Sequence, residues 1–398
     1  MIERDLAPHL LKAATNFPAV TLTGPRQSGK STLCRNLFPD YHYANLEQPD
    51  TRRYALEDPR GFLQDLEGGA ILDEIQNAPE LASWLQVRID EEPTPGQWIL
   101  TGSQNFAISN SVSQSLAGRS AILNLLPLTL NETERFENTR TDVLEQVLIR
   151  GGYPRIFEQG LEPADWLSAY VATYVERDVR SLSGITDLMT FQRFLSLCAG
   201  RSGQTLNYSA LASDCGVSQP TAKAWTSILH ASFLAFILPA WSGNVRKRLT
   251  RSPKLVFVDS GLLCWLLDIR TPQQLRTHPL KGAIFESWVL AEFYKRRHHA
   301  NEPRGLYYYR DQSGLEVDLL VEMAGNIDLV ECKSGQTVTG SMTRPLKRLI
   351  ELLPEETARS AAIVYGGQQR QRRQTIDMVP WRQLPDLIEQ QLAAMPPT

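Results

Sequence analysis

The stretch that decides the fold is AVTLTGPRQSGKST, residues 19–32. Its start, residues 19–23, has the apolar and β-branched composition of a buried strand. Residues 24–31 then match the pattern G-x-x-x-x-G-K-[ST] at every fixed position. In such loops, backbone N–H groups surround phosphates and the following helix N-terminus favours negative charge. The predicted phosphate-binding loop consists of Gly24, Pro25, Arg26, Gln27, Ser28, Gly29, Lys30, Ser31 and Thr32.

Two residues of this loop carry specific chemistry. A lysine at the position of Lys30 reaches the β- and γ-phosphates of a nucleotide, and a hydroxyl at the position of Ser31 holds Mg²⁺. The simpler alternative is a glycine-rich turn that matches the pattern by accident. The strand before the loop and the helix-like residues 32–37 after it favour the nucleotide site.

A second apolar run, residues 69–72, ends in the acidic pair Asp73 and Glu74. The aspartate would hold Mg²⁺, directly or through water, and the glutamate would orient and polarise the attacking water. An Asp-Glu pair at a strand end is common by itself. Downstream of a phosphate-binding loop, it predicts that ATP is hydrolysed as well as bound, with Lys30, Asp73 and Glu74 as the core of the site.

A third run, residues 97–100, leads into Thr101-Gly102-Ser103-Gln104. The three runs together are typical of AAA+ ATPases, in which an inserted strand ends in a polar sensor near the γ-phosphate. Ser103 is the predicted sensor, Thr101 and Gln104 are alternatives, and a plain strand-to-loop turn remains open.

Arg119 stands just before the next apolar strand. An arginine there suits a finger that reaches the ATP of a neighbouring copy and neutralises transition-state charge. A surface arginine or a salt bridge at the strand start fits the sequence equally well.

Six motifs resemble one family of prokaryotic AAA+-like ATPases, whose C-terminal domain has long been labelled as of unknown function. They are GPRQSGKST (24–32), AILDEIQ (70–76), ILTGSQN (99–105), SLAGR (115–119), RGGYPRIFE (150–158) and YVERDVR (174–180). The resemblance covers nearly the whole chain. It implies an ATPase module, a helical lid and a C-terminal nuclease-like domain, without implying a biological task.

Changes of pattern along the 398 residues predict an α/β protein of several units. We expect an AAA+-like P-loop ATPase core over 1–135 and a helical lid over 136–200. A winged helix-turn-helix over 201–275 and a restriction-endonuclease-like α/β domain over 276–398 are expected to follow. Arg150 and Arg155, in the lid, fit a second nucleotide sensor and ordinary surface arginines equally.

Residues 206–225 have the pattern of a helix-turn-helix, with Gly216 at the turn and Ser218 capping the second helix. Strand-like residues 236–241 and 254–258 would enclose a wing. The predicted DNA contacts are Ser218, Gln219, Thr221 and Lys223 on the helix and Arg246, Lys247, Arg248 and Arg251 on the wing. Winged helices also bind proteins, and a charge run is often only a solvated loop.

Two strand-like runs in the last third carry Asp318 and the Glu-x-Lys pair Glu331 and Lys333. Alternate residues of a strand share a face, so Asp318 and Glu331 can hold one Mg²⁺ while Lys333 polarises a water. With Glu286 on a preceding helix, the set resembles the PD-(D/E)XK nucleases, although Val317 replaces the usual proline. A salt-bridge cluster, or a domain that binds DNA without cutting it, remains open.

Composition sets few limits. The chain is 42% hydrophobic with a net charge of −3, so a DNA-binding surface would have to be local. Five scattered cysteines predict neither disulfides nor zinc, and no signal core or bilayer-spanning run is apparent. We expect a cytoplasmic protein without a membrane partner.

The predicted function is an ATP-hydrolysing, Mg²⁺-using protein that binds DNA and processes or remodels it. Because AAA+ proteins typically act as rings, we expect a homo-oligomer, with a hexameric ring as one form. Two alternatives stay open: a nuclease of defence or repair gated by ATP, and a regulator or scaffold that binds protein partners.

Overall fold

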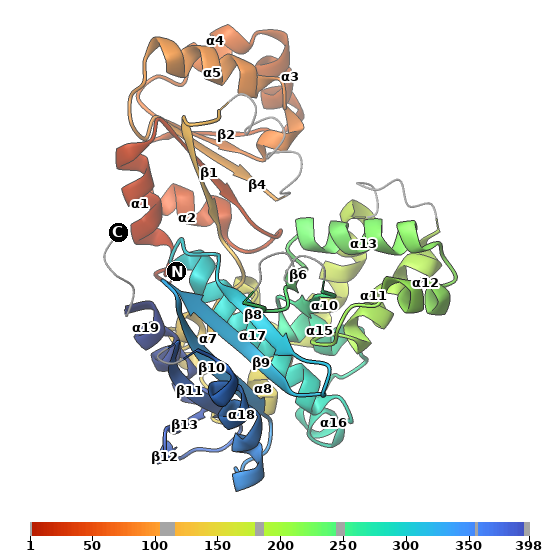
Figure 1. Cartoon of the computed structure of the whole chain (residues 1–398). Helices are drawn as coiled ribbons and strands as arrows, with labels where there is room; N and C mark the ends of the chain where they lie inside the picture. The colour runs from red at the N-terminus through yellow and green to blue at the C-terminus, as the bar shows by residue number, and fades with distance from the viewer. Residues whose placement is uncertain (1, 104–115, 180–186, 244–250, 355–356, 394–398) are drawn as a thin grey trace.

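Two large β-sheets organise the chain, one in each half, with helices between them (Figure 1). The computed structural model describes residues 2–103, 116–179, 187–243, 251–354 and 357–393. Within these residues, no helix combines the length and the apolarity that crossing a bilayer requires.

The N-terminal sheet is parallel throughout, as the alternation of strands and helices predicts. Its strands are β1 (Ala19–Thr23), β2 (His42–Asn45), β3 (Ala70–Asp73), β4 (Trp98–Gly102) and β5 (Ser120–Asn124), in the order β2-β3-β4-β1-β5. The strand β4 lies between β1 and β3, with Ile99 beside both Val20 and Ile71. The ends of the phosphate-loop strand and of the Asp-Glu strand therefore flank the end of β4.

Helices cover both faces of this sheet. They are α1 (Ala7–Asn16), α2 (Lys30–Leu37), α3 (Pro49–Glu57), α4 (Pro59–Gln64) and α5 (Leu81–Glu91). One buried cluster joins α1 and α2 to Val20 and Ile99, and another joins α3, α4 and α5 to Leu72 and Leu100. Alternate residues of each strand thus face opposite helical layers.

The middle of the chain is almost entirely helical. Its elements are α7 (Leu130–Thr133), α8 (Leu144–Arg150), α9 (Pro154–Glu158), α10 (Pro163–Tyr170), a π-helical segment (Val171–Val179), α11 (Leu188–Gly200), α12 (Tyr208–Cys215) and α13 (Gln219–Ala231). Asn207 caps α12 and Ser218 caps α13, and Gly216 between them adopts φ +79°. This left-handed turn lets the two helices follow each other closely.

A short antiparallel pair comes next, β6 (Ala235–Leu238) with β7 (Lys254–Phe257). It is followed by α15 (Ser260–Leu266), α16 (Pro272–Thr277) and the long helix α17 (Lys281–His299). The chain beside β6 also reaches the C-terminal sheet, because Tyr308 N donates to Pro239 O at 3.0 Å.

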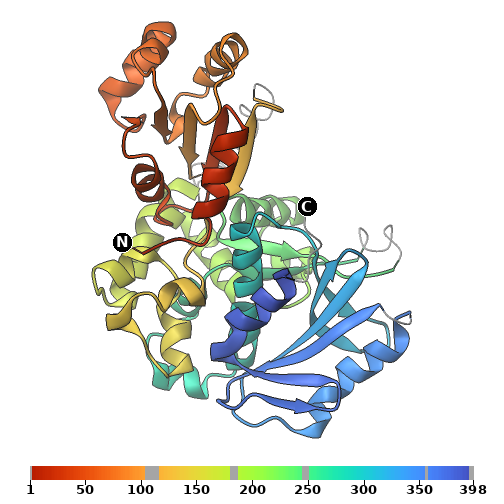
Figure 2. The same cartoon turned by 90° about the vertical axis from the view of Figure 1, so that its left-hand side faces the viewer.

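The C-terminal sheet is mixed, in the order β12-β13-β11-β10-β9-β8. Its strands are β8 (Leu306–Arg310), β9 (Glu316–Met323), β10 (Asn326–Lys333), β11 (Ala358–Tyr365), β12 (Gln371–Arg373) and β13 (Ile376–Pro380). Helix α18 (Arg344–Leu352) packs on one face, and α17 with α19 (Leu384–Ala393) packs on the other (Figure 2). The middle β10, β11 and β13 are parallel to one another.

Helix α17 lies at the centre of the molecule (Figure 1). Its residues Phe285, Trp288 and Phe293 are buried in one cluster that also holds the cores of the middle helices and one face of the C-terminal sheet. The sequence pattern separates a lid, a helix-turn-helix and a C-terminal unit, whereas the structure packs them on a continuous apolar core.

Candidate functional site

The phosphate-binding loop has the backbone shape that its glycines permit. Gly24 and Gly29 adopt φ +150° and +94°, and a Cβ added to Gly24 would lie 2.0 Å from the Leu125 carbonyl oxygen. Only glycine fits at such a position. Ser28 Oγ, in the middle of the loop, is buried and has no hydrogen-bond partner within the described residues. The loop therefore offers an unused polar atom, as expected of a binding loop.

Lys30 begins α2 and is buried beneath the loop. Its Nζ donates to the carbonyl oxygens of Gly24 and Pro25, both at 3.0 Å. Burial lowers the pKa of this ammonium, although Glu74 and Asp73 act in the opposite direction. Burial disfavours the charged form of Lys30, and nearby phosphate oxygens would stabilise that form.

Asp73, at the end of β3, accepts hydrogen bonds from three side chains. Ser31 Oγ donates to its Oδ1 at 2.8 Å, Tyr43 OH donates to its Oδ2 at 2.6 Å, and Thr101 Oγ1 donates to Oδ1 as well. A serine hydroxyl and a carboxylate in direct contact are an oxygen-donor pair of the kind that Mg²⁺ prefers. The sequence identified Ser31 and Asp73 for this role but did not identify Tyr43.

Glu74 lies next to the predicted sensor. Ser103 Oγ, just after β4, donates to Glu74 Oε2 at 3.1 Å, and Gln76 Nε2 contacts both Glu74 and Ser103. Glu74 itself adopts φ +57°, which is uncommon for a residue with a Cβ. The contact between Ser103 and Glu74 follows from the strand order, because β4 lies beside β3. Gln104, the other alternative, lies outside the described residues.

A cavity of about 400 Å³ opens in front of the loop. Lys30, Ser31, Thr32 and Glu74 line it on the ATPase side, and Arg155 lines it from α9. Arg150, by contrast, donates to Thr139 O away from this cavity. Of the two arginines, Arg155 lines the cavity in front of the loop and Arg150 does not.

Arg119 lies at the opposite end of the sheet from its own phosphate-binding loop. Ser120 pairs with Ala19 at the start of β1, whereas the loop follows Thr23 at the end of β1. The guanidinium Nε is 2.5 Å from Asp90 Oδ1 of α5. Arg119 cannot reach the ATP of its own chain from this position.

A buried network beneath the loop was not apparent from the sequence. Arg4 donates to Ser28 O and Leu126 O, both at 2.7 Å, and to Glu132 Oε1 at 2.8 Å. Leu126 N donates to Nε2 of His299, the last residue of α17, at 3.1 Å. The network connects the phosphate-binding loop to the central helix.

Asp5, Glu132 and His299 bring their ligand atoms within 4.8 Å of one another, and within the described residues they form the only such group of three. Arginine already neutralises this group. Arg4 contacts Glu132, Arg135 contacts Asp5, and Arg296 is 3.8 Å from Asp5. The group is therefore a structural ion-pair network with no need of a metal.

The C-terminal site lies at one edge of the second sheet. The antiparallel pairing of β9 with β10 reaches Leu319 and Val330, one residue short of Asp318 and Glu331. Asp318 Oδ2 accepts from Cys332 N at 2.8 Å, and Lys333 Nζ donates to Glu331 Oε1 at 2.6 Å. The predicted aspartate, glutamate and lysine thus gather where the two strands meet.

Lys254, the first residue of β7, adds a charge that the sequence did not point to. Its side chain is 2% exposed, and its ammonium lies 2.8 Å from Glu286 Oε1 and 2.7 Å from Glu316 Oε1. No local pattern joins a lysine of the small β6–β7 pair to carboxylates of α17 and β9, so the contact could only be found in three dimensions.

Negative charge is in excess at this edge. Burial, followed by repulsion from Asp318, raises the pKa of Glu286 to about 8 and that of Glu331 to about 7. Glu331 Oε2 is buried without a hydrogen-bond partner within the described residues. Four carboxylates, those of Glu286, Glu316, Asp318 and Glu331, face two ammonium groups and the guanidinium of Arg310, which is 3.8 Å from Glu316 Oε2. One negative charge remains in excess, and the oxygen donors fit an added divalent cation.

Replacing Lys254 with alanine should destabilise the fold. The change leaves Glu286 and Glu316 without their buried cation, and breaking a buried pair in this way costs about 3 kcal/mol. Chemical denaturation measures the loss, and Lys12→Ala on the exposed face of α1 is the matched control. Mg²⁺ should raise the melting temperature of the variant more than that of the wild type. Equal stability of wild type and variant would contradict this electrostatic role.

Two of the four helix-turn-helix residues predicted to contact DNA already bind each other, and the other two are exposed. Ser218 Oγ accepts from Thr221 N at 3.2 Å as the α13 cap, and it also lies 2.7 Å from Thr221 Oγ1. Gln219 and Lys223 are exposed on α13. Lys223 is therefore the only positively charged side chain among these four predicted DNA contacts.

The predicted wing is only partly described. Arg246, Lys247 and Arg248 lie outside the described residues. Arg251 Nη1 donates to Arg310 O at 3.1 Å, so this arginine holds the segment against β8. Any contact with phosphates would come in addition to that structural role.

Family comparisons agree with this arrangement. Residues 16–134 match the model of the AAA domain family. Residues 141–273 and 281–384 match two families described as domains of unknown function, DUF8612 and DUF4143. With the parallel sheet, the phosphate-binding loop and the Asp-Glu strand end, the match defines an ATPase of the AAA+ type.

Two proteins resemble the chain over most of its length. They are the uncharacterized proteins Rv2008c of Mycobacterium tuberculosis and Mb2031c of Mycobacterium bovis, each 33% identical over 373 residues, which are 92% of this chain and 80% of the relative. The chain belongs to the same family as these two proteins. Among solved structures, the Walker-type ATPase PABY2304 of Pyrococcus abyssi aligns with a TM-score of 0.45 at 16% identity, over 67% of this chain and 96% of that one.

Proposed function

We propose that this protein hydrolyses ATP to process or remodel DNA, with the ATP site in the N-terminal unit and DNA contacts in the rest of the chain. The observation that carries the proposal is the C-terminal cluster, in which Asp318, Glu331 and Lys333 meet at a sheet edge with excess negative charge. Carboxylates and a lysine in this arrangement suit a metal ion that contacts a phosphodiester.

In the ATP site, Lys30 would bind the β- and γ-phosphates and Ser31 with Asp73 would hold Mg²⁺. The metal ion would neutralise charge that develops on the phosphates. Glu74 would orient the attacking water and accept its proton, and Ser103 fixes the carboxylate that does so. Arg155 would approach the phosphates from α9, because it lines the same cavity.

Helix α17 supports a coupling between the two sites. Glu286 near its start belongs to the C-terminal cluster, and His299 at its end receives the hydrogen bond from Leu126 N. The two residues are about 20 Å apart along the helix axis. Between them, Lys295 Nζ donates to Leu128 O at 2.8 Å. A movement of the phosphate-binding loop would therefore displace α17 and, with it, Glu286 in the C-terminal cluster.

A homo-oligomeric ring is part of the same proposal. Arg119 faces away from its own nucleotide, so it could complete only the site of a neighbouring copy, after leaving Asp90. The two alternatives, a nuclease of defence or repair gated by ATP and a regulator or scaffold that binds protein partners, predict different responses of the chain to DNA.

Direct binding to DNA tests the proposal. Duplex DNA labelled with a fluorophore should bind the full chain in the presence of Mg²⁺, with affinity that falls as salt rises. Lys223→Glu on α13 should weaken binding roughly tenfold, because it reverses a charge near the phosphates. Lys12→Glu on α1 is the matched control. Absence of binding at low salt to any DNA would overturn the proposal and favour the regulator of protein partners.

A further inference from the structure

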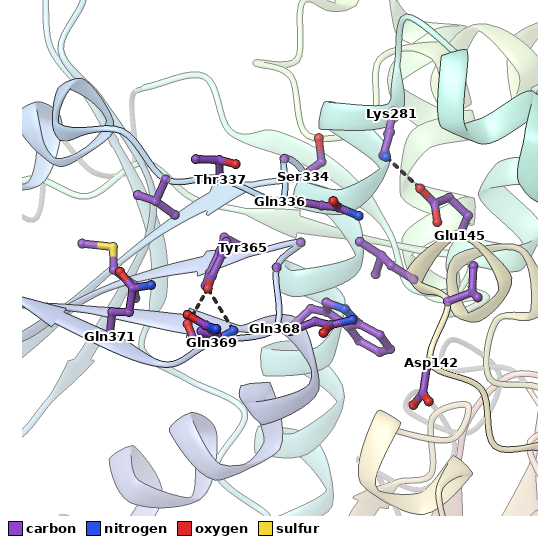
Figure 3. Close-up of a pocket in the computed structure, with 18 of the residues that line it drawn as sticks. Asp142, Glu145, Lys281, Ser334, Gln336, Thr337, Tyr365, Gln368, Gln369 and Gln371 are labelled. Atoms are coloured by element: carbon purple, nitrogen blue, oxygen red, sulfur yellow. Dashed lines mark hydrogen bonds and ion pairs between the residues drawn. The ribbon is translucent and has the colours of Figure 1, made fainter.

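A second large cavity, of about 970 Å³, opens between the C-terminal sheet and the helices α8, α16 and α17 (Figure 3). Asp142 and Glu145 line it from the helical side, and residues 334–338 and 365–369 line it from the sheet. It is separate from the nucleotide cavity, with which it shares no lining residue. Large polar cavities between units of a fold are common ligand sites.

The cavity lies where three parallel strands end. Ser334 follows β10, Gly366 follows β11 and Trp381 follows β13, and all three line it. In α/β sheets, ligands bind outside the carboxyl ends of parallel strands. This edge is also that of Lys333, whose carbonyl oxygen accepts from Gly366 N at 3.0 Å. The cavity therefore opens at the end of β10 that carries Glu331 and Lys333, although neither side chain lines it.

Two loops form a preorganised floor. A Cβ added to Gly366 would lie 2.4 Å from Ser334 O, and one added to Gly367 would lie 2.6 Å from Gln336 O. The backbones thus pack as closely as glycine allows, and Tyr365 OH holds the second loop by accepting from Gln369 N at 3.2 Å. A floor that is already ordered loses little entropy when a ligand binds.

The lining suits a nucleotide. The exposed amides of Gln336 and Gln368 have no hydrogen-bond partner within the described residues, and glutamine amides pair well with base edges. Three cations, Arg276, Lys281 and Arg373, also line the cavity. Lys281 Nζ lies 2.8 Å and Arg276 Nε lies 3.8 Å from Glu145 Oε1, and a phosphate would be a second anionic partner for them. Asp142 and Glu145 keep the net charge of the lining low, so the cavity fits a nucleotide with a single phosphate better than one with a triphosphate.

We propose that this cavity binds one unpaired nucleotide, with its base on the two glutamine amides and its phosphate near the cations. The inference rests on the proposed function, because it places an unpaired strand of DNA at the strand ends that also carry the predicted nuclease-like residues. A free nucleoside monophosphate has the same chemistry, and experiment separates the two sources.

Binding of three fluorescent or competing probes to the full chain tests this site. The probes are a blunt duplex, the same duplex with a single-stranded tail, and deoxythymidine monophosphate, which lacks the β- and γ-phosphates that the ATP site contacts. The tailed duplex should bind at least tenfold more tightly than the blunt one. The double variant Gln336→Ala/Gln368→Ala should abolish that preference without changing the affinity for blunt duplex, and Gln64→Ala on α4 is the matched control.

The outcomes separate this inference from the proposed function. A double variant that keeps the preference for the tail, or a wild type without such a preference, overturns the nucleotide cavity while the proposed function stands. Failure of every DNA to bind overturns both. Competition by the monophosphate at the affinity of the tailed duplex, lost in the double variant, supports the site and assigns it to free nucleotides.

Discussion

Glu74→Gln should lower the rate of ATP hydrolysis by a factor of at least about 100 while nucleotide binding persists. Glutamine has nearly the same shape but cannot accept a proton, and general-base catalysis contributes factors of about 10² to 10⁴. The hydrogen bond from Ser103 at 3.1 Å can still form with the amide oxygen, so the site stays assembled. Steady-state phosphate release measures the rate, and binding of a fluorescent ATP analogue measures affinity.

Lys30→Ala provides the contrast. It removes the ammonium under the loop and should abolish binding of the same analogue together with hydrolysis. If Glu74→Gln hydrolyses ATP at the wild-type rate while Lys30→Ala does not, the water-orienting role belongs to a different residue.

Arg4→Ala should destabilise the protein by about 3–5 kcal/mol, because it leaves Glu132 buried and ionised without its cation. Burial alone would raise the pKa of Glu132, but Arg4 and then His299 lower it to about 2. The stabilisation is therefore fully present above pH 4.5, the ordinary pKa, and is lost as the pH falls towards 2. Chemical denaturation at neutral and at acidic pH measures both effects.

An exposed pair supplies the control for this prediction. Arg88 Nη2 lies 3.4 Å from both Glu67 Oε1 and Glu92 Oε2, and these glutamate side chains are 68% and 57% exposed. Removing such a pair costs about 0–1 kcal/mol. Similar losses for Arg4→Ala and Arg88→Ala would show that the network beneath the loop contributes little.

The ATPase unit is largely predictable from sequence because its signals are local. The loop from Gly24 to Ser31 joins a strand to a helix within a few residues, and its glycines determine the backbone shape of the loop. Parallel pairing then places the ends of β1, β3 and β4 together, which brings Ser103 to Glu74 as the order of strands requires.

Contacts between distant segments could not be predicted in this way. Lys254 of β7 meets Glu286 of α17 and Glu316 of β9, and Arg4 meets Glu132, although each pair lies far apart in the sequence. Charged residues in such positions look like ordinary surface residues in the sequence. Arg251 is an opposite example. The sequence predicts that it contacts DNA, whereas in the structure it donates a hydrogen bond to the carbonyl of Arg310.

The central claim is that the protein uses ATP hydrolysis to process or remodel DNA. Its most direct test is the steady-state ATPase rate of the full chain with and without DNA. Duplex, single-stranded and four-way-junction DNA are compared, with Glu74→Gln as the blank. The account predicts that at least one form raises the rate severalfold above the DNA-free value. A rate that no DNA changes, together with no DNA binding at low salt, would contradict it.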